Sequence, residues 1–208
     1  MGARAGIIVT GTEVLSGQIS DRNGPWVSAR LLELGVDVAH QLICGDRPAD
    51  LHAQLGFLAG QDLDLIVTTG GLGPTADDLT VATVADFCGL PTDTDAALQR
   101  RIEEIVREWR RLAPGESLSP ALEAGIAKQA VVPSGATPIG PTGTAPGFAV
   151  PPDDRHPAVL ILPGPPGELR HMWPMALETD VVQEALSGRD DLQHRMIRAY
   201  GLSEPDLA

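Results

Sequence analysis

Short apolar runs alternate with helical segments through the first ninety residues, and this alternation constrains the fold more than any other feature. The predicted strands span 6–10, 36–44 and 63–69, and the predicted helices span 25–34, 49–59 and a third segment from Asp78 or Thr80 to Gly89. A glycine follows each strand directly. Strands that alternate with helices of this length predict an α/β fold with a mostly parallel sheet covered on both faces. Such folds place ligands at the carboxyl ends of the strands.

A long helix is predicted in the middle of the chain. Its apolar positions recur at three- and four-residue steps, at Leu98, Ile102, Ile105, Trp109 and Leu112. This stripe is expected to face the core, with a dimer interface as the alternative. The arginines around it favour a solvated face with pairs such as Glu103–Arg107, although a basic patch for an anionic partner is also conceivable.

Further elements are predicted in the second half. They are strands at 147–150 and 158–162, a helix over about 167–186 with a kink or restart near Pro174, a strand at 192–200 and a helix start at 203–205. Two free cysteines, Cys44 and Cys88, are expected to be small buried hydrophobic residues in a reducing cytoplasm.

Charge and hydropathy exclude several classes of partner. The chain carries 15 basic and 28 acidic residues, a net charge of −13, which argues against nucleic-acid binding. Its longest apolar run is 158–162, far short of the roughly twenty residues that a membrane span needs. The chain does not open with a basic segment followed by an apolar one, so we expect no secretory signal. We therefore expect a cytoplasmic protein that binds neither nucleic acid nor membranes.

The strongest local motif is the glycine-rich segment 68–80, Thr-Thr-Gly-Gly-Leu-Gly-Pro-Thr-Ala-Asp-Asp-Leu-Thr. Three glycines after a buried strand let the backbone approach a ligand and turn its N–H groups towards an anion. Asp77 and Asp78 would repel phosphate directly, so a bridging divalent cation is expected. The alternative is a tight strand–helix turn in which Asp78 is the N-cap.

Other polar loops follow the first two predicted strands. Thr12 and Glu13 lie between Gly11 and Gly17, and Glu13 is either a ligand of a metal or ribose hydroxyl or a surface residue. Asp21 and Asn23 are expected mainly to cap the next helix, with ligand binding as a second role. Asp46 is a third candidate carboxylate or the residue of an Asx turn.

Two proline- and glycine-rich loops, 140–147 and 162–168, are ordinary turns when taken singly but together suggest a pocket walled by backbone amides. Lys128, the only lysine, is by default a surface residue. The histidines show no paired spacing. The sequence contains no G-x-S-x-G, Walker A or G-x-G-x-x-G motif after a predicted strand, which disfavours serine hydrolases, P-loop NTPases and NAD dehydrogenases.

Together these motifs resemble the N-terminal domain of the CinA (competence/damage-inducible protein A) family, which has the MoaB/MogA molybdopterin-binding fold. The resemblance is densest at 11–19, 21–23, 45–46, 69–80, 128–130, 143–147 and 162–164. It implies a three-layer α/β/α domain over residues 1–190, and residues 191–208 resemble the start of a further small domain. The chain is expected to be a truncated or abbreviated member that lacks the family's nicotinamide-mononucleotide deamidase domain.

The resemblance also implies a function. CinA-type domains are associated with metal-dependent hydrolysis of ADP-ribose to AMP and ribose 5-phosphate, whereas MogA relatives adenylylate molybdopterin. Our first hypothesis is a metal-dependent ADP-ribose pyrophosphatase. The second is a noncatalytic molybdopterin- or nucleotide-binding module, and the third, which is weaker, is a molybdopterin adenylyltransferase. A homo-oligomer, a dimer or trimer, is expected by analogy.

Candidate site residues follow from the motifs and the resemblance. Asp78, Asp46 and Lys128 are the candidate catalytic residues, and Glu13, Asp46, Asp77 and Asp78 are the candidate ligands of Mg²⁺, Mn²⁺ or Co²⁺. The candidate ligand-binding residues are Thr10, Gly11, Thr12, Asn23, Thr69, Gly70, Gly71, Leu72, Gly73, Pro74, Thr75, Gly143, Thr144, Ala145, Gly147, Pro163 and Gly164.

The second half departs from the family pattern. Ile126 and Ala127 stand where the family often has asparagine and arginine, and Gly140 replaces another asparagine. These changes remove contacts to phosphate or ribose but leave the acidic residues in place. Lys128 is the cation that stays in this motif, and Lys128→Ala is expected to weaken nucleotide binding.

Overall fold

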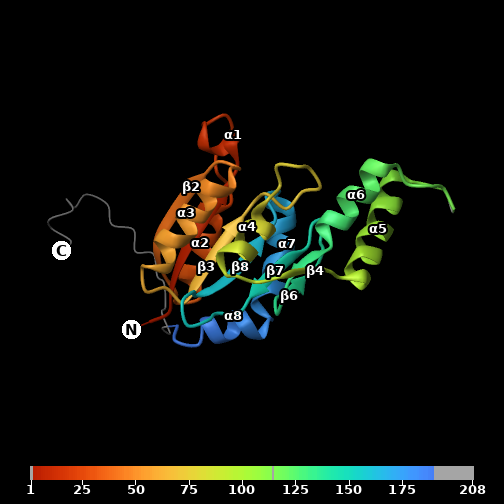
Figure 1. Ribbon diagram of the computed structural model, residues 1–208. Coiled ribbons are helices and arrows are strands. Elements are labelled where there is room, and N and C mark those ends of the chain that lie inside the picture. The colour runs from red at the N-terminus through yellow and green to blue at the C-terminus, as the bar shows by residue number, and fades with distance from the viewer. Residues whose placement is uncertain (1, 114, 190–208) are drawn as a thin grey trace, which may run out of the picture.

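A six-stranded sheet forms the centre of the computed structural model, which describes residues 2–113 and 115–189 (Figure 1). Its strands lie in the order β2-β1-β3-β8-β7-β6. They span β1 Arg4–Thr10, β2 Asp37–Cys44, β3 Leu65–Thr69, β6 Thr137–Ile139, β7 Gly147–Val150 and β8 Ala158–Leu162. The pairs β1–β2, β1–β3 and β3–β8 are parallel, and β7 is antiparallel to both of its neighbours. The predicted mostly parallel sheet is therefore confirmed.

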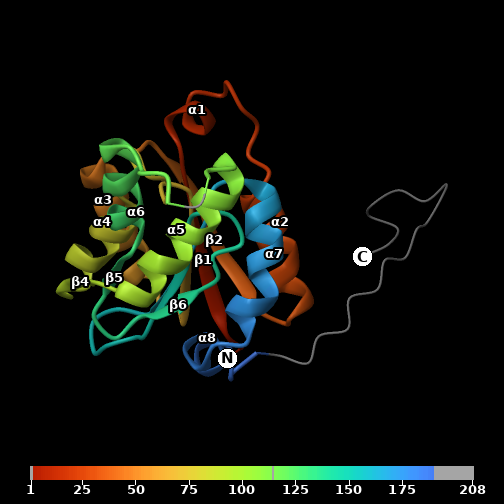
Figure 2. The same ribbon diagram turned by 90° about the vertical axis from the view of Figure 1, so that its right-hand side faces the viewer.

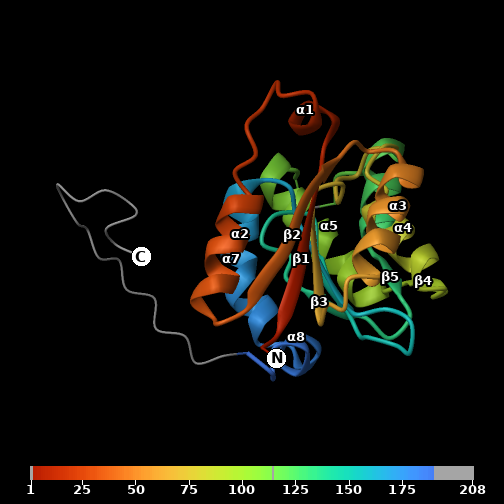
Figure 3. The ribbon, with the colours of Figure 1, turned by 90° about the vertical axis from the view of Figure 1, so that its left-hand side faces the viewer.

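Helices cover both faces of this sheet, as predicted. They span α1 Thr12–Leu15, α2 Gly24–Glu33, α3 Pro48–Ala59, α4 Thr80–Phe87, α5 Ala96–Arg110, α6 Pro120–Gln129, α7 Pro166–Leu177 and α8 Asp180–Ala185. Figures 2 and 3 show α2 and α7 on one side of the sheet and α3, α4 and α6 on the other. A second, two-stranded sheet pairs β4 (Thr92–Thr94) with β5 (Val131–Pro133).

Two apolar clusters bind the three layers together. Successive strand residues point to opposite faces, so Ile7 packs with the α2–α7 layer while Ile8 packs with the α3–α4 layer. In the first cluster Leu31 and Met172 cover the sheet, and in the second Leu55 does so. All five of these side chains are completely buried, which explains why the central strands are almost continuous apolar runs.

The loops that carry the sequence motifs gather at one edge of the sheet. Strands β1, β2, β3 and β8 run parallel, so their carboxyl ends lie together. The antiparallel strand β7 begins at this same edge, which brings the 140–146 loop there as well. Figure 1 shows α1 projecting beyond the sheet at this edge.

Several sequence predictions need correction. Helix α4 begins at Thr80, one of its two predicted starts, and the N-cap position is Leu79, so Asp78 is not the N-cap. The last helix breaks between α7 and α8, after Leu177, and Pro174 lies inside α7. The sheet formed by β4 and β5 was not predicted at all. The predicted strand at 192–200 and the boundary at 190 lie outside the described residues.

The apolar stripe on α5 is only partly correct. Leu98 and Ile102 are buried as predicted, but the next buried position is Val106. Trp109 is 79% exposed, because it comes after the part of α5 that packs on the body of the domain. The predicted pair Glu103–Arg107 is present, with a 2.8 Å distance between the Arg107 Nε and the Glu103 Oε1 atoms.

Two substitutions on α5 test this assignment. Ile102→Ala is expected to lower the free energy of unfolding by about 2–5 kcal/mol because it leaves a cavity under the helix. Trp109→Ala is expected to change it by less than about 0.5 kcal/mol. Urea unfolding of both variants is the measurement, and a larger loss for Trp109→Ala than for Ile102→Ala would contradict the assignment.

Within the described residues, no helix is both long and apolar enough to cross a membrane.

Candidate ligand-binding site

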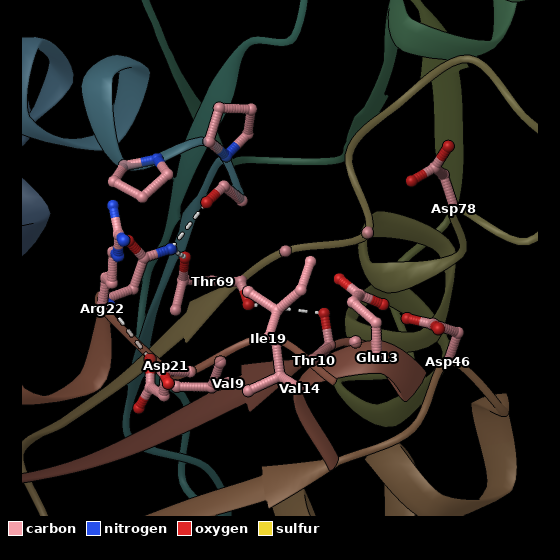
Figure 4. A pocket seen from close by; sticks show the side chains of 18 of the residues that line it. Val9, Thr10, Glu13, Val14, Ile19, Asp21, Arg22, Asp46, Thr69 and Asp78 are labelled. Carbon is pink, nitrogen blue, oxygen red and sulfur yellow. Dashed lines mark hydrogen bonds between the residues drawn. The ribbon is translucent and has the colours of Figure 1, made fainter. Parts of the chain in front are cut away.

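A pocket of about 420 Å³ opens at the carboxyl edge of the sheet. Three loops form its walls, one after β1, one after β3 and one after β8, and Asp46 adds a carboxylate after β2. Figure 4 shows the side chains of these loops around the pocket. The lining includes eleven predicted site residues, which are Thr10, Gly11, Glu13, Asn23, Asp46, Thr69, Gly70, Gly71, Asp77, Asp78 and Gly164.

Three consecutive carbonyl groups of the glycine-rich loop accept hydrogen bonds from other parts of the protein. The Gly70 carbonyl accepts a 2.8 Å hydrogen bond from the Thr80 hydroxyl, and the Gly71 carbonyl accepts one of 3.2 Å from the Thr80 N–H. The Leu72 carbonyl accepts a 3.0 Å bond from Nε2 of Gln129. Each of these carbonyls is therefore held by a partner inside the protein.

The opposite ends of the same peptide groups are free. The N–H groups of Gly71, Leu72 and Gly73 donate to no other group among residues 2–113 and 115–189. In a trans peptide the N–H points away from the carbonyl, so each of these donors points away from the partner that holds the carbonyl of its own peptide group. Successive backbone N–H groups that have no partner within a protein are suited to binding an anion.

Glycine is required at the two positions where this loop leaves β3. Gly70 has φ of +110°, and a Cβ atom there would lie 2.4 Å from the Thr10 carbonyl oxygen. Gly71 has φ of +65°, and its Cβ atom would lie 2.3 Å from the Thr80 hydroxyl. A side chain at either position would therefore displace the contacts that orient the loop.

The loops after β1 and β2 are joined by Asp46. Its Oδ2 atom accepts a 2.9 Å hydrogen bond from the Thr12 N–H and a 2.8 Å bond from the Thr12 hydroxyl. The Glu13 carboxylate folds back over Gly11, 2.9 Å from where a Cβ atom would stand. Asp46 thus holds Thr12, which itself does not line the pocket, and places negative charge at the pocket wall.

Asp77 and Asp78 form a compact turn with Thr75. The Thr75 N–H donates a 3.0 Å bond to the Asp78 carboxylate, and the Thr75 hydroxyl contacts both carboxylates. This hydroxyl is the main reason why the pKa of Asp77 lies below its ordinary value, and the positive charge of Lys128 adds a smaller effect. Asp77 is consequently ionised at neutral pH and contributes negative charge beside the amides of the glycine-rich loop.

Asn23 connects the three loops. Its Nδ2 atom donates to Thr69 Oγ1 at 2.9 Å and to the Gly164 carbonyl at 2.7 Å. Thr69 in turn donates a 2.9 Å bond to the Pro163 carbonyl. Asn23 occupies the N-cap position of α2 but makes no side-chain cap bond, whereas Asp21 accepts from the N–H groups of Asn23 and Gly24. The capping role predicted for Asn23 was wrong, and that predicted for Asp21 is confirmed.

The carboxylates do not form a closed metal cage. Among the described residues, no group of three or more histidine, cysteine, aspartate or glutamate side chains is placed to hold a metal ion. Mg²⁺ commonly takes one or two carboxylates and fills its remaining positions with phosphate oxygens and water. The donor set therefore suits a cation that arrives with a phosphate ligand, and it does not suit a metal held by protein side chains alone.

Other predicted residues lie outside this pocket. Leu72, Gly73 and Lys128 line a smaller hollow of about 110 Å³ that shares Gly71 and Asp78 with the main pocket. The Lys128 ammonium group bonds the Thr75 carbonyl.

The remaining candidates, which are Pro74, Thr75, Gly143, Thr144, Ala145, Gly147 and Pro163, line neither hollow. Gly143 lies against the carboxylate of Glu168, whose burial raises its pKa.

Arg22 is the functional candidate that the sequence argument missed. It is the only basic side chain among the residues that line the main pocket, and Figure 4 shows it near Asp21 and Thr69. Its place beside Asn23 in the motif 21–23 was the available signal. Pro165 and Pro166 also line the pocket and were not selected.

The fold and the pocket define an α/β domain with a small-molecule site at the carboxyl ends of its strands. More specifically, the model of the family described as "probable molybdopterin binding domain" matches residues 6–184, and the chain belongs to this family. The family suggests a small-molecule ligand.

Curated relatives support the resemblance to CinA. The chain is 56% identical over 208 residues to a "CinA-like protein" of Mycobacterium sp. (strain JLS), covering 100% of this chain and 48% of the relative. It is 52% identical over 210 residues to a "CinA-like protein" of Mycobacterium tuberculosis (strain ATCC 25177 / H37Ra), covering 99% and 48%. The chain thus spans about half the length of these relatives.

Solved structures show the same fold. A protein CinA of unknown function from Thermoplasma acidophilum matches with a TM-score of 0.72 at 28% identity, over 86% of this chain and 99% of that chain. The molybdopterin biosynthesis enzyme MoaB from Thermus thermophilus matches with a TM-score of 0.54 at 18% identity, over 89% and 97%. The second match bears on the fold alone. The predicted MoaB/MogA-like architecture is confirmed.

Proposed function

We propose that this domain binds a nucleotide through its phosphates and hydrolyses the pyrophosphate bond of ADP-ribose, releasing AMP and ribose 5-phosphate. The observation that carries the proposal is the row of three amides at Gly71, Leu72 and Gly73, which have no hydrogen-bond partner in the described part of the chain, beside the carboxylates of Asp77 and Asp78. The amides suit a phosphate, and the carboxylates suit a cation and a water molecule. The resemblance to CinA supports ADP-ribose as the substrate.

The residues of the site have different roles in the proposed reaction. The amides of the glycine-rich loop bind and orient the phosphates, and they stabilise the charge that develops on a phosphate oxygen during hydrolysis. Arg22 offers a positive charge to the same ligand from the opposite wall. A divalent cation, Mg²⁺, Mn²⁺ or Co²⁺, would supply Lewis acidity and neutralise phosphate charge when bound. Asp78 and Asp46 are the carboxylates that we assign to the cation and to orienting water.

Net charge does not oppose this proposal. The chain carries −13 overall, but the proposed phosphate contacts come from backbone amides, which need no basic patch. Lys128 contributes indirectly, because its ammonium group bonds the Thr75 carbonyl and so holds the glycine-rich loop in place. Lys128→Ala is therefore expected to weaken binding by releasing the loop.

The proposal is tested by incubating the purified protein with ADP-ribose and each of the three cations, and measuring AMP by chromatography. We expect AMP and ribose 5-phosphate in equal amounts, and no product with EDTA. Nucleotide binding without turnover under any of the cations would instead favour a noncatalytic nucleotide- or molybdopterin-binding module. Consumption of molybdopterin together with ATP would favour an adenylyltransferase. Light scattering on the same sample tests the expected homo-oligomer.

A further inference from the structure

The Leu72–Gly73 peptide group of the glycine-rich loop is hydrogen-bonded to a residue far away in the sequence. Thr80, which follows the loop, holds the carbonyls of Gly70 and Gly71. The Leu72 carbonyl is held by Gln129, which lies 57 residues further along the chain at the end of α6. We infer that Gln129 is a positioning residue that directs the Gly73 amide towards a bound phosphate. This inference rests on the proposed phosphate binding.

The local sequence cannot hold this peptide group by itself. Leu72 stands between Gly71 and Gly73, and glycine accepts a wide range of backbone conformations at little cost. The plane of the Leu72–Gly73 peptide group could therefore flip, and the carbonyl oxygen would then face the phosphate in place of the N–H. A donor on the opposite side prevents this, because the carbonyl that accepts the bond must stay where the donor is.

Gln129 is suited to holding the Leu72 carbonyl because it is buried and because its helix, α6, contacts the loop at other residues. Gln129 is 7% exposed and its bond to the Leu72 carbonyl is buried, so water competes little for this carbonyl, and a lost bond would leave a buried acceptor unpaired. Helix α6 also contacts the loop elsewhere. A Cβ atom on Gly125 would lie 2.7 Å from Cβ of Pro74, and Lys128 bonds the Thr75 carbonyl. The end of α6 is thus a fixed support behind the loop.

Two substitutions separate positioning from simple packing. Gln129→Met keeps the length of the side chain but removes the donor. Gln129→Glu keeps its shape, and the introduced carboxyl donates a hydrogen bond to the Leu72 carbonyl only while it is protonated. When ionised it can only accept, and it repels that carbonyl. Gln99→Glu, on α5 and outside both hollows, is the matched charge control.

The experiment measures the affinity of each variant for inorganic pyrophosphate by calorimetry, relative to the unmodified protein at each pH from about 5 to about 9. We expect Gln129→Met to bind about tenfold more weakly throughout. Relative affinity of Gln129→Glu should be near that of the unmodified protein at low pH and fall as the carboxyl ionises. Gln99→Glu should stay unchanged. If Gln129 only filled space, the relative affinity of Gln129→Glu for pyrophosphate would not recover at low pH.

Each outcome has a defined meaning. The inference is overturned if folded Gln129→Met and Gln129→Glu bind pyrophosphate as the unmodified protein does, or if the relative affinity of Gln129→Glu does not vary with pH. Absence of pyrophosphate binding by the unmodified protein also overturns it. If pyrophosphate binds with the expected pattern but ADP-ribose is not hydrolysed, the proposed hydrolysis fails while the positioning role of Gln129 stands.

Discussion

Asp78→Asn is expected to lower the rate of ADP-ribose hydrolysis by about 100-fold or more, a loss typical for removing a group that orients a proton transfer. The asparagine oxygen can still accept the 3.0 Å hydrogen bond from the Thr75 N–H, so the turn is retained. The charge of the Asp78 carboxylate is lost, whereas the Asp77 carboxylate is retained. AMP release at saturating ADP-ribose is the measurement.

Asp78→Ala is a second variant, and it is expected to have a larger effect than Asp78→Asn. It removes the acceptor for Thr75 as well as the charge, so it should weaken nucleotide binding in addition to turnover. Glu33→Gln, on the exposed end of α2 and outside the pocket, is the matched charge control. Turnover by folded Asp78→Asn at the rate of the unmodified protein would rule out a catalytic role for this carboxylate.

Gly70→Ala is expected to have the largest effect on stability of any single methyl addition to the loop. The new Cβ atom would stand 2.4 Å from the Thr10 carbonyl oxygen, and the residue would keep φ of +110° only under strain. We expect the free energy of unfolding to fall by about 2–4 kcal/mol, with nucleotide binding weakened in the molecules that fold. Chemical denaturation followed by circular dichroism measures the loss.

The same addition on α3 is the control. Gly56 has nothing within 4 Å of its Cβ position and lies on an exposed face of a regular helix. Gly56→Ala should therefore raise the free energy of unfolding by about 0.5–1 kcal/mol. A stable Gly70→Ala variant with normal nucleotide binding would show that the loop does not need its observed backbone conformation.

Hydrophobic patterning was sufficient to predict the sheet and its principal helices. The strands β1, β3 and β8 are buried at nearly every position because both of their faces are covered, and each therefore contains at least three consecutive apolar residues that can be recognised in the sequence. The strands β4 and β5 were missed since each has only three residues, and β4 is exposed along its length. On α5, steps of three and four residues are both compatible with a helix. The prediction stepped by three residues from Ile102 to Ile105, whereas the buried side chain is that of Val106, four residues on, and the next predicted position, Trp109, is exposed.

The loops and acidic residues of the candidate site could be predicted because they are recognised from short stretches of sequence. Gly70, Gly71 and Asp46 lie within two residues of strand ends, and Asp78 lies two residues before the start of α4. Their orientation was not predictable, because it depends on contacts across long sequence separations. The bond from Gln129 to the Leu72 carbonyl and that from Asn23 to the Gly164 carbonyl form only when α6 and β8 reach the same edge of the sheet.

The most direct test of the account is a titration of the ¹⁵N-labelled protein with ADP-ribose, followed through the backbone amide signals by NMR. Binding of the phosphates by the glycine-rich loop predicts large downfield shifts of the Gly71, Leu72 and Gly73 amide protons, which have no acceptor within the described part of the chain. The amide of Gly70 already donates to Leu162 and should move less. Saturable binding that leaves these three signals in place and shifts others would contradict the account.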